Sequence, residues 1–365
     1  MTDPPTTASS HTGDAVRDQR IERYEALVSP QALLDELPVD GERTQGVLEA
    51  RVQTHAVLDR HDDRLLVVVG PCSVHDPQAT LEYAQRLSEQ AQRLREDLLV
   101  TMRVYFEKPR TTTGWKGLIN DPLLDGSGDV NLGLRTARGL LLEVLSLGLP
   151  VGCEFLDPVI PQYISDVVSW GAIGARTVES QTHRQLGSGL SMPVGFKNRT
   201  DGNVQVAVDA VRAAAVPHAF TGIDMTGTPA IVYTRGNQDC HVILRGGRGS
   251  PNYEAHAVAT ALAQLRQAGL PERLMIDCSH DNSGKDAERQ PAVAADVGRQ
   301  VAQGSREIVG VMLESFLVAG RQELSLQALK YGQSITDACL GWDSTLEVLE
   351  GLARAVRDRR CASRS

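Results

Sequence analysis

Eight short apolar runs, spread between residues 65 and 313, constrain the fold of this chain more than any other feature. They are LLVVVG, VTMRVYFE, VGCEF, AIGAR, VGFK, VILRG, LMIDCS and IVGVML, and helical stretches separate most of them. Continuous apolar strands that alternate with helices predict a parallel sheet buried on both faces. Eight such units favour a closed (β/α)8 TIM barrel, and an open doubly wound sheet is the alternative that the pattern leaves.

Other segments do not fit this repeat and predict additions to the barrel. Residues 1–20 are polar and rich in Pro, Thr and Ser, which predicts a disordered tail. Residues 21–64 predict an N-terminal helical extension with a role in oligomer formation or regulation, and residues 218–236 predict a hairpin inserted between the fifth and sixth units. The barrel is then expected at residues 65–355, followed by a flexible C-terminus at residues 356–365.

The net charge argues against several classes of partner. The chain of 365 residues has a formal net charge of -9, whereas proteins that bind nucleic acid or membrane surfaces need a basic face. No run approaches the ~18 apolar residues of a membrane span, and the N-terminal MTDPPTTASSHTGD lacks the apolar core of a signal peptide. Six cysteines without a CxxC pair indicate a reducing compartment. We therefore expect a cytoplasmic protein whose clustered cations bind small anionic molecules.

Four residues at or beyond the ends of the runs are candidate ligands for a metal ion. Active sites of (β/α)8 barrels lie at the C-terminal ends of the strands. Cys72 follows the first run, and His280 and Glu314 follow the seventh and eighth. Asp337 lies in the segment beyond, and barrel closure would bring the eighth strand next to the first. One thiolate, one imidazole and two carboxylates suit one divalent transition metal ion, such as Mn2+, Fe2+, Co2+ or Zn2+.

Cationic side chains gather at four other runs. Arginine binds phosphate and carboxylate through a bidentate fork, and lysine binds them as a point charge. Several such cations around one pocket suit ligands that carry phosphate and carboxylate groups, so the segment FEKPRTTTGWKG is interpreted as part of an anion clamp. Arg103 lies near the start of the second run. The candidate anion-binding residues are Arg103, Lys108, Arg110, Thr111, Arg176, Lys197 and Arg245.

Each of these residues also has an ordinary structural explanation. A buried cysteine such as Cys72 is usually a small core residue, and a single histidine such as His280 more often has a structural role. Glu154 and Asp157, after the third run, would neutralise neighbouring arginines. The functional interpretation therefore depends on the joint occurrence of ligands and cations at the strand ends.

Long motifs in the chain resemble one enzyme family. GPCSVHDP, MRVYFEKPRTTTGWKGLINDP, WGAIGARTVESQTHR, PVGFKNRTDG, ILRGGRG and ITDACLGW together resemble the type I 3-deoxy-D-arabino-heptulosonate 7-phosphate (DAHP) synthases, also called phospho-2-dehydro-3-deoxyheptonate aldolases. The resemblance extends from about residue 40 to the C-terminus. It implies a metal-dependent (β/α)8 transferase that converts phosphoenolpyruvate, D-erythrose 4-phosphate and water to DAHP and phosphate. This reaction is the first step of the shikimate pathway to chorismate and the aromatic amino acids.

The same resemblance implies roles for individual residues. The matches to its metal ligands are Cys72, His280, Glu314 and Asp337. The matches to residues that hold phosphoenolpyruvate are Arg103, Lys108, Arg176, Lys197 and Arg245, and those that hold the erythrose phosphate are Arg110 and Thr111. Lys108, His280 and Asp337 are the predicted catalytic residues, with Lys108 placed to handle a proton. A homodimer or homotetramer is expected, because elements added to the barrel build the oligomer in the family.

The chain departs from the family pattern at two places, and other functions are considered beside it. Where family members have GFKNGTDG, this chain has GFKNRTDG, which puts Arg199 near the pocket. The hairpin sequence FTGIDMTG differs from that of forms in which the region near Phe220 and Gly222 binds a regulatory aromatic amino acid. The alternatives are a copy of the enzyme dedicated to a specialised aromatic pathway, a 3-deoxy-octulosonate 8-phosphate synthase, a Schiff-base aldolase that uses Lys197, and a non-catalytic regulatory barrel.

Overall fold

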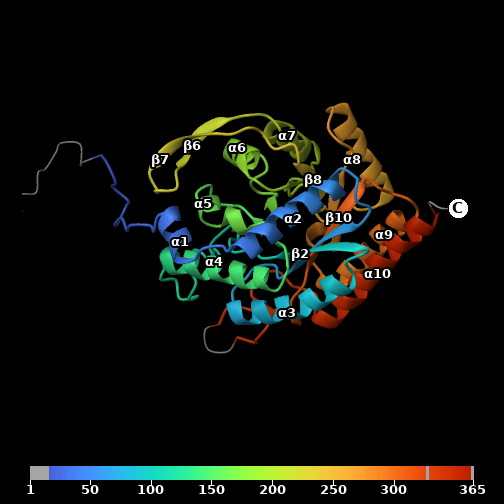
Figure 1. Cartoon of the computed structure of the whole chain (residues 1–365), viewed down its shortest axis with the longest axis horizontal. Coiled ribbons are helices and arrows are strands. Elements are labelled where there is room, and N and C mark those ends of the chain that lie inside the picture. Colours follow the sequence, from blue (N-terminus) through green and yellow to red (C-terminus); the bar gives the residue numbers. More distant parts are fainter. Residues whose placement is uncertain (1–15, 326–328, 363–365) are drawn as a thin grey trace, which may run out of the picture.

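A closed barrel of eight parallel strands forms the centre of the molecule in the computed structural model, which describes residues 16–325 and 329–362. The strands follow one another around the barrel in the order β1-β10-β9-β8-β5-β4-β3-β2, with helices outside them (Figure 1). This arrangement confirms the predicted (β/α)8 TIM barrel and rules out the open doubly wound sheet. The barrel strands are β1 Leu65–Gly70, β2 Leu98–Arg103, β3 Val151–Glu154, β4 Trp170–Ile173, β5 Val194–Lys197, β8 His241–Leu244, β9 Leu274–Asp277 and β10 Ile308–Glu314.

Helices connect the successive strands and cover the outside of the barrel. Capping carboxylates fix the starts of the first two: Asp76 accepts a hydrogen bond from the Ala79 N–H at 3.1 Å, and Asp129 accepts one from the Leu132 N–H at 2.9 Å. The connecting helices are α3 Pro77–Arg93, α4 Val130–Ser146, α5 Pro161–Ile164, α6 Gln181–Gly189, α7 Gln205–Ala214, α8 Ala255–Gln267 and α9 Gln290–Ala302, and α10 Trp342–Ala362 follows the last strand. Short 3-10 turns lie at Ser165–Val167, His280–Asn282 and Ala287–Arg289, and β11 Val318–Arg321 pairs with β12 Gln333–Ser334 beyond β10.

The end of β2 differs from the sequence prediction. The apolar run at residues 100–107 was expected to contain Arg103 near its start, but β2 runs from Leu98 to Arg103. Its register with β3 ends at the pair Arg103 and Gly152. Arg103 is therefore the last residue of the strand, and its side chain lies at the C-terminal end of the barrel.

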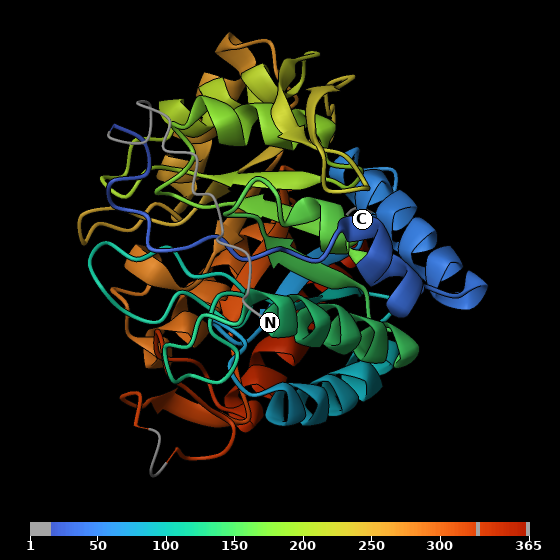
Figure 2. The same ribbon diagram turned by 90° about the vertical axis from the view of Figure 1, so that its left-hand side faces the viewer.

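The N-terminal extension closes the opposite end of the barrel. It contains α1 Pro30–Glu36 and α2 Gly41–Leu58. Val57 and Leu58, at the end of α2, are buried in the apolar cluster that fills the barrel interior. Figure 2 shows α2 on one side of the barrel and the long loop at residues 104–129 on the other side. Helix α2 thus leaves the loops that follow the strands available to form a site.

The predicted hairpin is present between the fifth and sixth barrel strands. β6 Ala219–Ile223 pairs antiparallel with β7 Pro229–Tyr233. Its turn contacts the extension, because the Gln31 N–H donates to the Met225 carbonyl oxygen at 2.7 Å. Residues 16–20 form exposed turns, whereas the rest of the predicted disordered tail, residues 1–15, lies outside the described residues.

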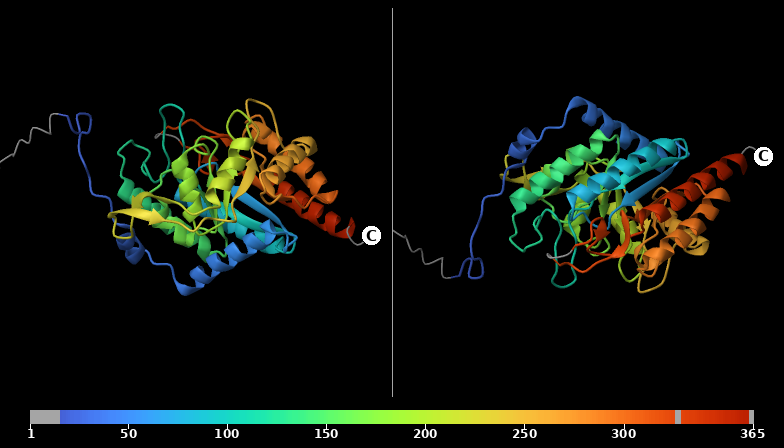
Figure 3. Two further views of the ribbon diagram at one scale, coloured as in Figure 1. Left: turned by 90° about the horizontal axis from the view of Figure 1, so that it is seen from above. Right: turned by 90° about the horizontal axis from the view of Figure 1, so that it is seen from below.

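The C-terminal boundary predicted from the sequence is wrong. Residues 356–362 belong to α10 and are not a flexible terminus. Val356 is fully buried and packs in the core with Leu349 and Leu352, which explains why the helix continues past residue 355. Figure 3 shows that α10 ends on the side of the barrel away from the N-terminal segment. Residues 363–365 lie outside the described part of the chain. None of the described helices combines the length and the apolarity of a membrane span.

Candidate active site

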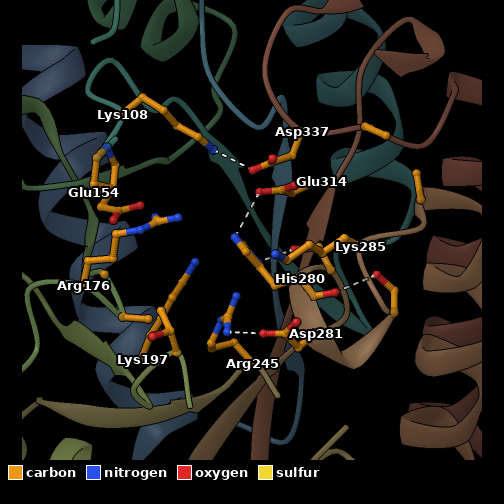
Figure 4. Close-up of a pocket in the computed structure, with 18 of the residues that line it drawn as sticks. Lys108, Glu154, Arg176, Lys197, Arg245, His280, Asp281, Lys285, Glu314 and Asp337 are labelled. Carbon is orange, nitrogen blue, oxygen red and sulfur yellow. Dashed lines mark hydrogen bonds and ion pairs between the residues drawn. The ribbon is translucent and has the colours of Figure 1, made fainter. Parts of the chain in front are cut away.

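A polar cavity of about 550 Å3 opens at the C-terminal ends of the barrel strands. Its wall contains the last residues of four strands, which are Arg103, Glu154, Lys197 and Glu314. Loops that follow the strands add Lys108, Thr111, Arg176, Arg245, His280 and Asp337. Figure 4 shows His280, Glu314 and Asp337 on one side of this cavity, and Arg176, Lys197 and Glu154 on the other. Most of the candidate metal ligands and most of the candidate anion-binding residues therefore line the same cavity.

Three of the four candidate metal ligands, His280, Glu314 and Asp337, lie on the same side of the cavity in Figure 4. Ligand atoms of Cys72, Glu314 and Asp337 all lie within 4.8 Å of one another. The Cys72 Sγ is 3.4 Å from the Asp337 Oδ2, and the His280 Nε2 is 3.8 Å from the Glu314 Oε1. Cys72 follows β1, Glu314 ends β10 and His280 follows β9, and these strands are neighbours in the barrel. Barrel closure is what brings residues this distant in sequence together.

His280 is held in a fixed orientation. Its Nδ1 lies 2.8 Å from the Asp277 Oδ2 and 2.8 Å from the Ser279 Oγ. Its backbone has a φ of 54°, a value that residues other than glycine rarely adopt. The Nε2 atom is left to face Glu314. A carboxylate on one ring nitrogen and an open second nitrogen is the arrangement typical of metal-binding histidines.

The charges around Cys72 strengthen this interpretation. Burial and the nearby Glu314 carboxylate raise the pKa of the Cys72 thiol to about 12, so a thiolate at this position needs a cation beside it. Lys108 provides one, because its Nζ lies 2.7 Å from the Cys72 Sγ and 2.9 Å from the Asp337 Oδ2. The Lys108 ammonium in turn lowers the pKa of Asp337. A thiol, an imidazole and two carboxylates in this arrangement fit one divalent transition metal ion.

Three cations in the cavity are buried and paired. Each interacts with a carboxylate from a neighbouring part of the barrel, since an unpaired buried charge would be costly. The pairs are Arg103 with Glu314 at 3.0 Å, Lys197 with Asp277 at 3.2 Å, and Arg245 with Asp281 at 2.6 Å. The Arg245 Nε is buried and has no hydrogen-bond partner among the described residues. A buried donor without an acceptor indicates a place for an anionic ligand.

The two residues predicted to hold the erythrose phosphate, Arg110 and Thr111, do not both lie in the cavity wall. Thr111 lines the cavity, but Arg110 is exposed and is not part of the cavity wall among the described residues. The Arg110 guanidinium lies against Gly114, since a Cβ added to that glycine would be 2.6 Å from it. The Arg110 side chain therefore folds back along its own loop. Arg176 is exposed at the rim and faces Glu154 in Figure 4. The structure thus brings together every predicted site residue except Arg110.

Sequence reasoning missed several partners of these residues. Asp281 was not predicted, although a buried Arg245 requires an anion and the motif SHDN supplies one. The Arg103 guanidinium lies 3.6 Å from the centre of the Tyr105 ring. Glu107 is buried and accepts the backbone N–H groups of Leu156 and Asp157, and burial raises its pKa to about 8. The sequence around Glu107 contains no signal that distinguishes this buried carboxyl from an exposed one.

Two further cysteines and one histidine near the strand ends have structural roles. Cys153 and Cys278 are buried inside strands or directly after them. His183 bridges the Ser180 Oγ at 2.9 Å and the Leu156 carbonyl oxygen at 2.7 Å, which is a structural role.

Comparisons with known proteins identify the family of the chain. The family model of the DAHP synthetase I family matches residues 45–350. The chain is 55% identical over 344 residues to the Phe-sensitive phospho-2-dehydro-3-deoxyheptonate aldolase of Escherichia coli K12, covering 94% of this chain and 98% of that protein. It is 51% identical over 355 residues to the phospho-2-dehydro-3-deoxyheptonate aldolase of Corynebacterium glutamicum, covering 95% and 96%.

A solved structure has the same architecture. The phospho-2-dehydro-3-deoxyheptonate aldolase of Francisella tularensis SCHU S4 superposes with a TM-score of 0.92 at 50% sequence identity, covering 93% of this chain and 99% of that one. These relatives do not favour the alternative of a 3-deoxy-octulosonate 8-phosphate synthase. The chain therefore belongs to the DAHP synthetase I family.

Proposed function

We propose that this protein is a 3-deoxy-7-phosphoheptulonate synthase that condenses phosphoenolpyruvate with D-erythrose 4-phosphate and water, and that it uses one divalent transition metal ion. The synthase activity follows from membership of the family. The observation that supports the metal-dependent form of the reaction is the grouping of Cys72, Glu314 and Asp337 within 4.8 Å, beside the oriented His280. The product enters the shikimate pathway to chorismate and the aromatic amino acids.

The buried cations would bind phosphoenolpyruvate. Arg103, Lys197 and Arg245 lie at the ends of three strands and could exchange part of their contact with a carboxylate for contact with the substrate. The unpaired Arg245 Nε supports this role, and Arg176 adds an exposed cation at the rim. Thr111 would contact the phosphate of the aldose, and Arg110 would have to turn toward the cavity to join it. This arrangement would align two anionic substrates before reaction, which lowers the barrier by reducing the entropy lost at that step.

The metal ion would be held by Cys72, His280, Glu314 and Asp337. When bound, it supplies Lewis-acid chemistry that polarises the aldehyde of erythrose 4-phosphate. The sulfur ligand favours Mn2+, Fe2+, Co2+ or Zn2+ over Mg2+, because Mg2+ prefers oxygen ligands.

Lys108 is positioned to manage a proton during the reaction. C3 of phosphoenolpyruvate forms a bond to the aldehyde carbon, and the aldehyde oxygen takes up a proton. Water then bonds to C2 and gives up one proton, which restores the Lys108 ammonium. The resulting hemiketal loses phosphate as the C2–O bond breaks and the ketone forms, and the hydroxyl proton leaves with the phosphate. The Lys108 Nζ, hydrogen bonded to Cys72 and Asp337, lies in the cavity wall from which it could donate the proton to the aldehyde oxygen.

A homodimer or homotetramer and a cytoplasmic location belong to the same proposal. The exposed apolar residues of the additions to the barrel, which include Tyr24 on the N-terminal segment and Ile231 and Tyr233 on β7, support an oligomer. The five buried cysteines are free thiols, which supports a reducing compartment.

The experiment that tests the proposal measures phosphate release from phosphoenolpyruvate with erythrose 4-phosphate before and after treatment with a chelator. We expect chelation to abolish activity, and Mn2+, Fe2+, Co2+ or Zn2+ to restore it better than Mg2+. The Cys72→Ala variant should lose both bound metal and turnover while it stays folded. Full activity after exhaustive chelation would contradict the metal role, and arabinose 5-phosphate as the better acceptor would contradict the assigned substrate.

A further inference from the structure

Three neighbouring parts of the barrel mouth carry the cations that we assign to phosphoenolpyruvate. Arg176 lies in the loop after β4, Lys197 ends β5, and Arg245 follows β8. All three line the cavity. A single anion can contact them together only if these parts keep a fixed spacing, so the contacts between the loops matter for binding.

The loops after β5 and β8 are joined by several hydrogen bonds. Asn198 is fully buried, and its amide group donates to the Gly246 carbonyl oxygen at 3.0 Å. The Arg245 N–H donates to the Asn198 Oδ1 at 2.8 Å, and the Arg248 N–H donates to the Thr200 carbonyl oxygen at 3.1 Å. Lys197 and Arg245 are therefore held as one unit.

The loop after β4 is attached to this unit through Arg199. One terminal nitrogen of Arg199 lies 2.8 Å from the Glu179 Oε1, and the other contacts the Asp201 carboxylate. Glu179 belongs to the loop that carries Arg176. Within the described residues, no other hydrogen bond or ion pair joins residues 174–180 to residues 198–204. Arg199 thus makes the direct polar contact between the Arg176 loop and the Lys197 loop, and Arg184 adds an indirect link between the Val178 and Val206 carbonyl oxygens.

We propose that Arg199 is a positioning residue for phosphoenolpyruvate, which fixes Arg176 relative to Lys197 by bridging Glu179 and Asp201. The inference rests on the proposed function, because it assumes that these cations bind that substrate. Arg199 is not part of the cavity wall among the described residues, so it acts through the loop and not on the ligand. The Arg199 side chain is 36% exposed and that of Glu179 is 56% exposed. Exposed pairs are weak, so the expected effect is about three- to fivefold in KM.

A rival explanation is that the positive charge of Arg199 attracts the anionic substrate from a distance. The two explanations predict opposite results for the partner residue. If Arg199 positions the loop, Glu179→Gln removes the bridge and raises the KM for phosphoenolpyruvate, as Arg199→Gln does. If Arg199 acts by long-range attraction, Glu179→Gln removes a negative charge near the mouth and lowers that KM.

The experiment compares Arg199→Gln, Glu179→Gln, the double variant and Arg199→Lys in the metal-supplied enzyme. Steady-state kinetics would give kcat and the KM for each substrate, and calorimetric titration would give the affinity for phosphoenolpyruvate. We expect both single variants to raise the KM and Kd for phosphoenolpyruvate about three- to fivefold, with kcat within about twofold. The double variant should be no worse than either single variant, because both remove the same contact. Arg199→Lys should recover part of the affinity.

The matched control is Arg266→Gln. Arg266 lies in the last turn of α8, and the substitution removes its ion pair with Glu272 beyond the helix. It should leave every kinetic constant unchanged. A fall in the KM of Glu179→Gln, an unchanged KM in both single variants, or an additive double variant would each overturn the inference. These outcomes are distinct from failure of the proposed function, which would appear as absence of synthase activity in the unmodified enzyme.

Discussion

The two ends of the barrel interior are built from the same strands but have opposite chemistry. In β9, Met275 belongs to the apolar cluster of the interior, and Asp277, two residues later, forms an ion pair with Lys197 of the cavity wall. In β10, Met312 and Glu314 have the same relationship. Because alternate residues of a strand face the same side, the interior changes from apolar to charged within about 7 Å.

This difference separates the source of stability from the site of function. The apolar end, closed by Val57 and Leu58 of α2, gains free energy from burial. The charged end pays a desolvation cost that its ion pairs only partly recover. We therefore expect changes at the apolar end to alter the free energy of unfolding and leave KM unchanged. Changes at the charged end should alter catalysis, and their effect on stability should depend on whether a charge is left unpaired.

The largest effect is expected for Asp277→Asn. The substitution keeps the shape of the side chain but leaves Lys197, 3.2 Å away, buried without its anion. The free energy of unfolding should fall by about 3–5 kcal/mol. His280 loses the carboxylate that orients it, so kcat/KM should fall by a further factor of about 10–100. Chemical denaturation and steady-state kinetics would measure the two effects.

A double variant sharpens this prediction. Adding Lys197→Met to Asp277→Asn removes the unpaired charge, so most of the lost stability should return while activity stays low. Asp286→Asn, on the exposed surface beside Arg289, is the matched control and should change neither quantity. If Asp277→Asn were as stable as the unmodified protein, an unpaired buried charge at this end of the barrel would not lower the free energy of unfolding.

At the apolar end, Leu99→Ala should cost stability without affecting the substrates. Leu99 is a buried member of the interior cluster and precedes Arg103 by four residues along β2. Truncation to alanine should lower the free energy of unfolding by about 2–5 kcal/mol through lost burial and the cavity left behind. KM for both substrates should stay the same. A large change in KM would show that the two ends of the barrel are coupled. The control is Leu132→Ala, at a partly exposed residue, which should change little in either measurement.

The buried apolar strands could be predicted from the sequence more completely than the ion pairs at the charged end. Runs such as LLVVVG and VGFK match β1 and β5 to the residue, because a buried parallel strand requires continuous apolar side chains. The apolar and aromatic run around Arg103 continues past the end of its strand, and the run alone could not show where pairing stops.

The ion pairs were not predictable in the same way. Glu314 and Arg103 are more than 200 positions apart, and their contact depends on barrel closure. The candidate ligands were identified because each follows a strand, but their pairing with Lys108 depends on loop conformation, for which the sequence contains no periodic signal. The same is true of the folded-back Arg110 side chain.

A pH dependence of stability is expected from the apolar end. The buried His241 accepts a hydrogen bond from the Trp170 indole N–H at 3.3 Å, and its Nδ1 lies 3.0 Å from the Asp239 carbonyl oxygen. Burial lowers the pKa of His241 from 6.5 to about 3. The unfolded chain thus takes up a proton near pH 6.5 that the folded protein does not bind until about pH 3. The free energy of unfolding should therefore fall as pH decreases through this window, by about 2 kcal/mol between pH 6.5 and pH 5.

Denaturation at several pH values would measure this effect. His241→Gln should flatten the curve between pH 6.5 and pH 5, because the titrating group is gone. His256→Gln removes an imidazole that is 80% exposed and should leave the slope unchanged. An equally steep curve in His241→Gln would assign the pH dependence to other groups and leave the apolar end without a titrating residue.

The smallest effect on stability and turnover is expected at the hairpin, which belongs to neither end of the barrel. Ile231 and Tyr233 on β7 are 64% and 78% exposed, and replacing both by serine should change the free energy of unfolding of the dissociated chain by less than about 0.5 kcal/mol. The same substitutions should lower the mass found by sedimentation velocity, because these side chains would lie in the proposed oligomer contact. A loss above about 1 kcal/mol in the dissociated chain would mean that the hairpin folds as part of the barrel, and stability could then no longer be assigned to the apolar end alone.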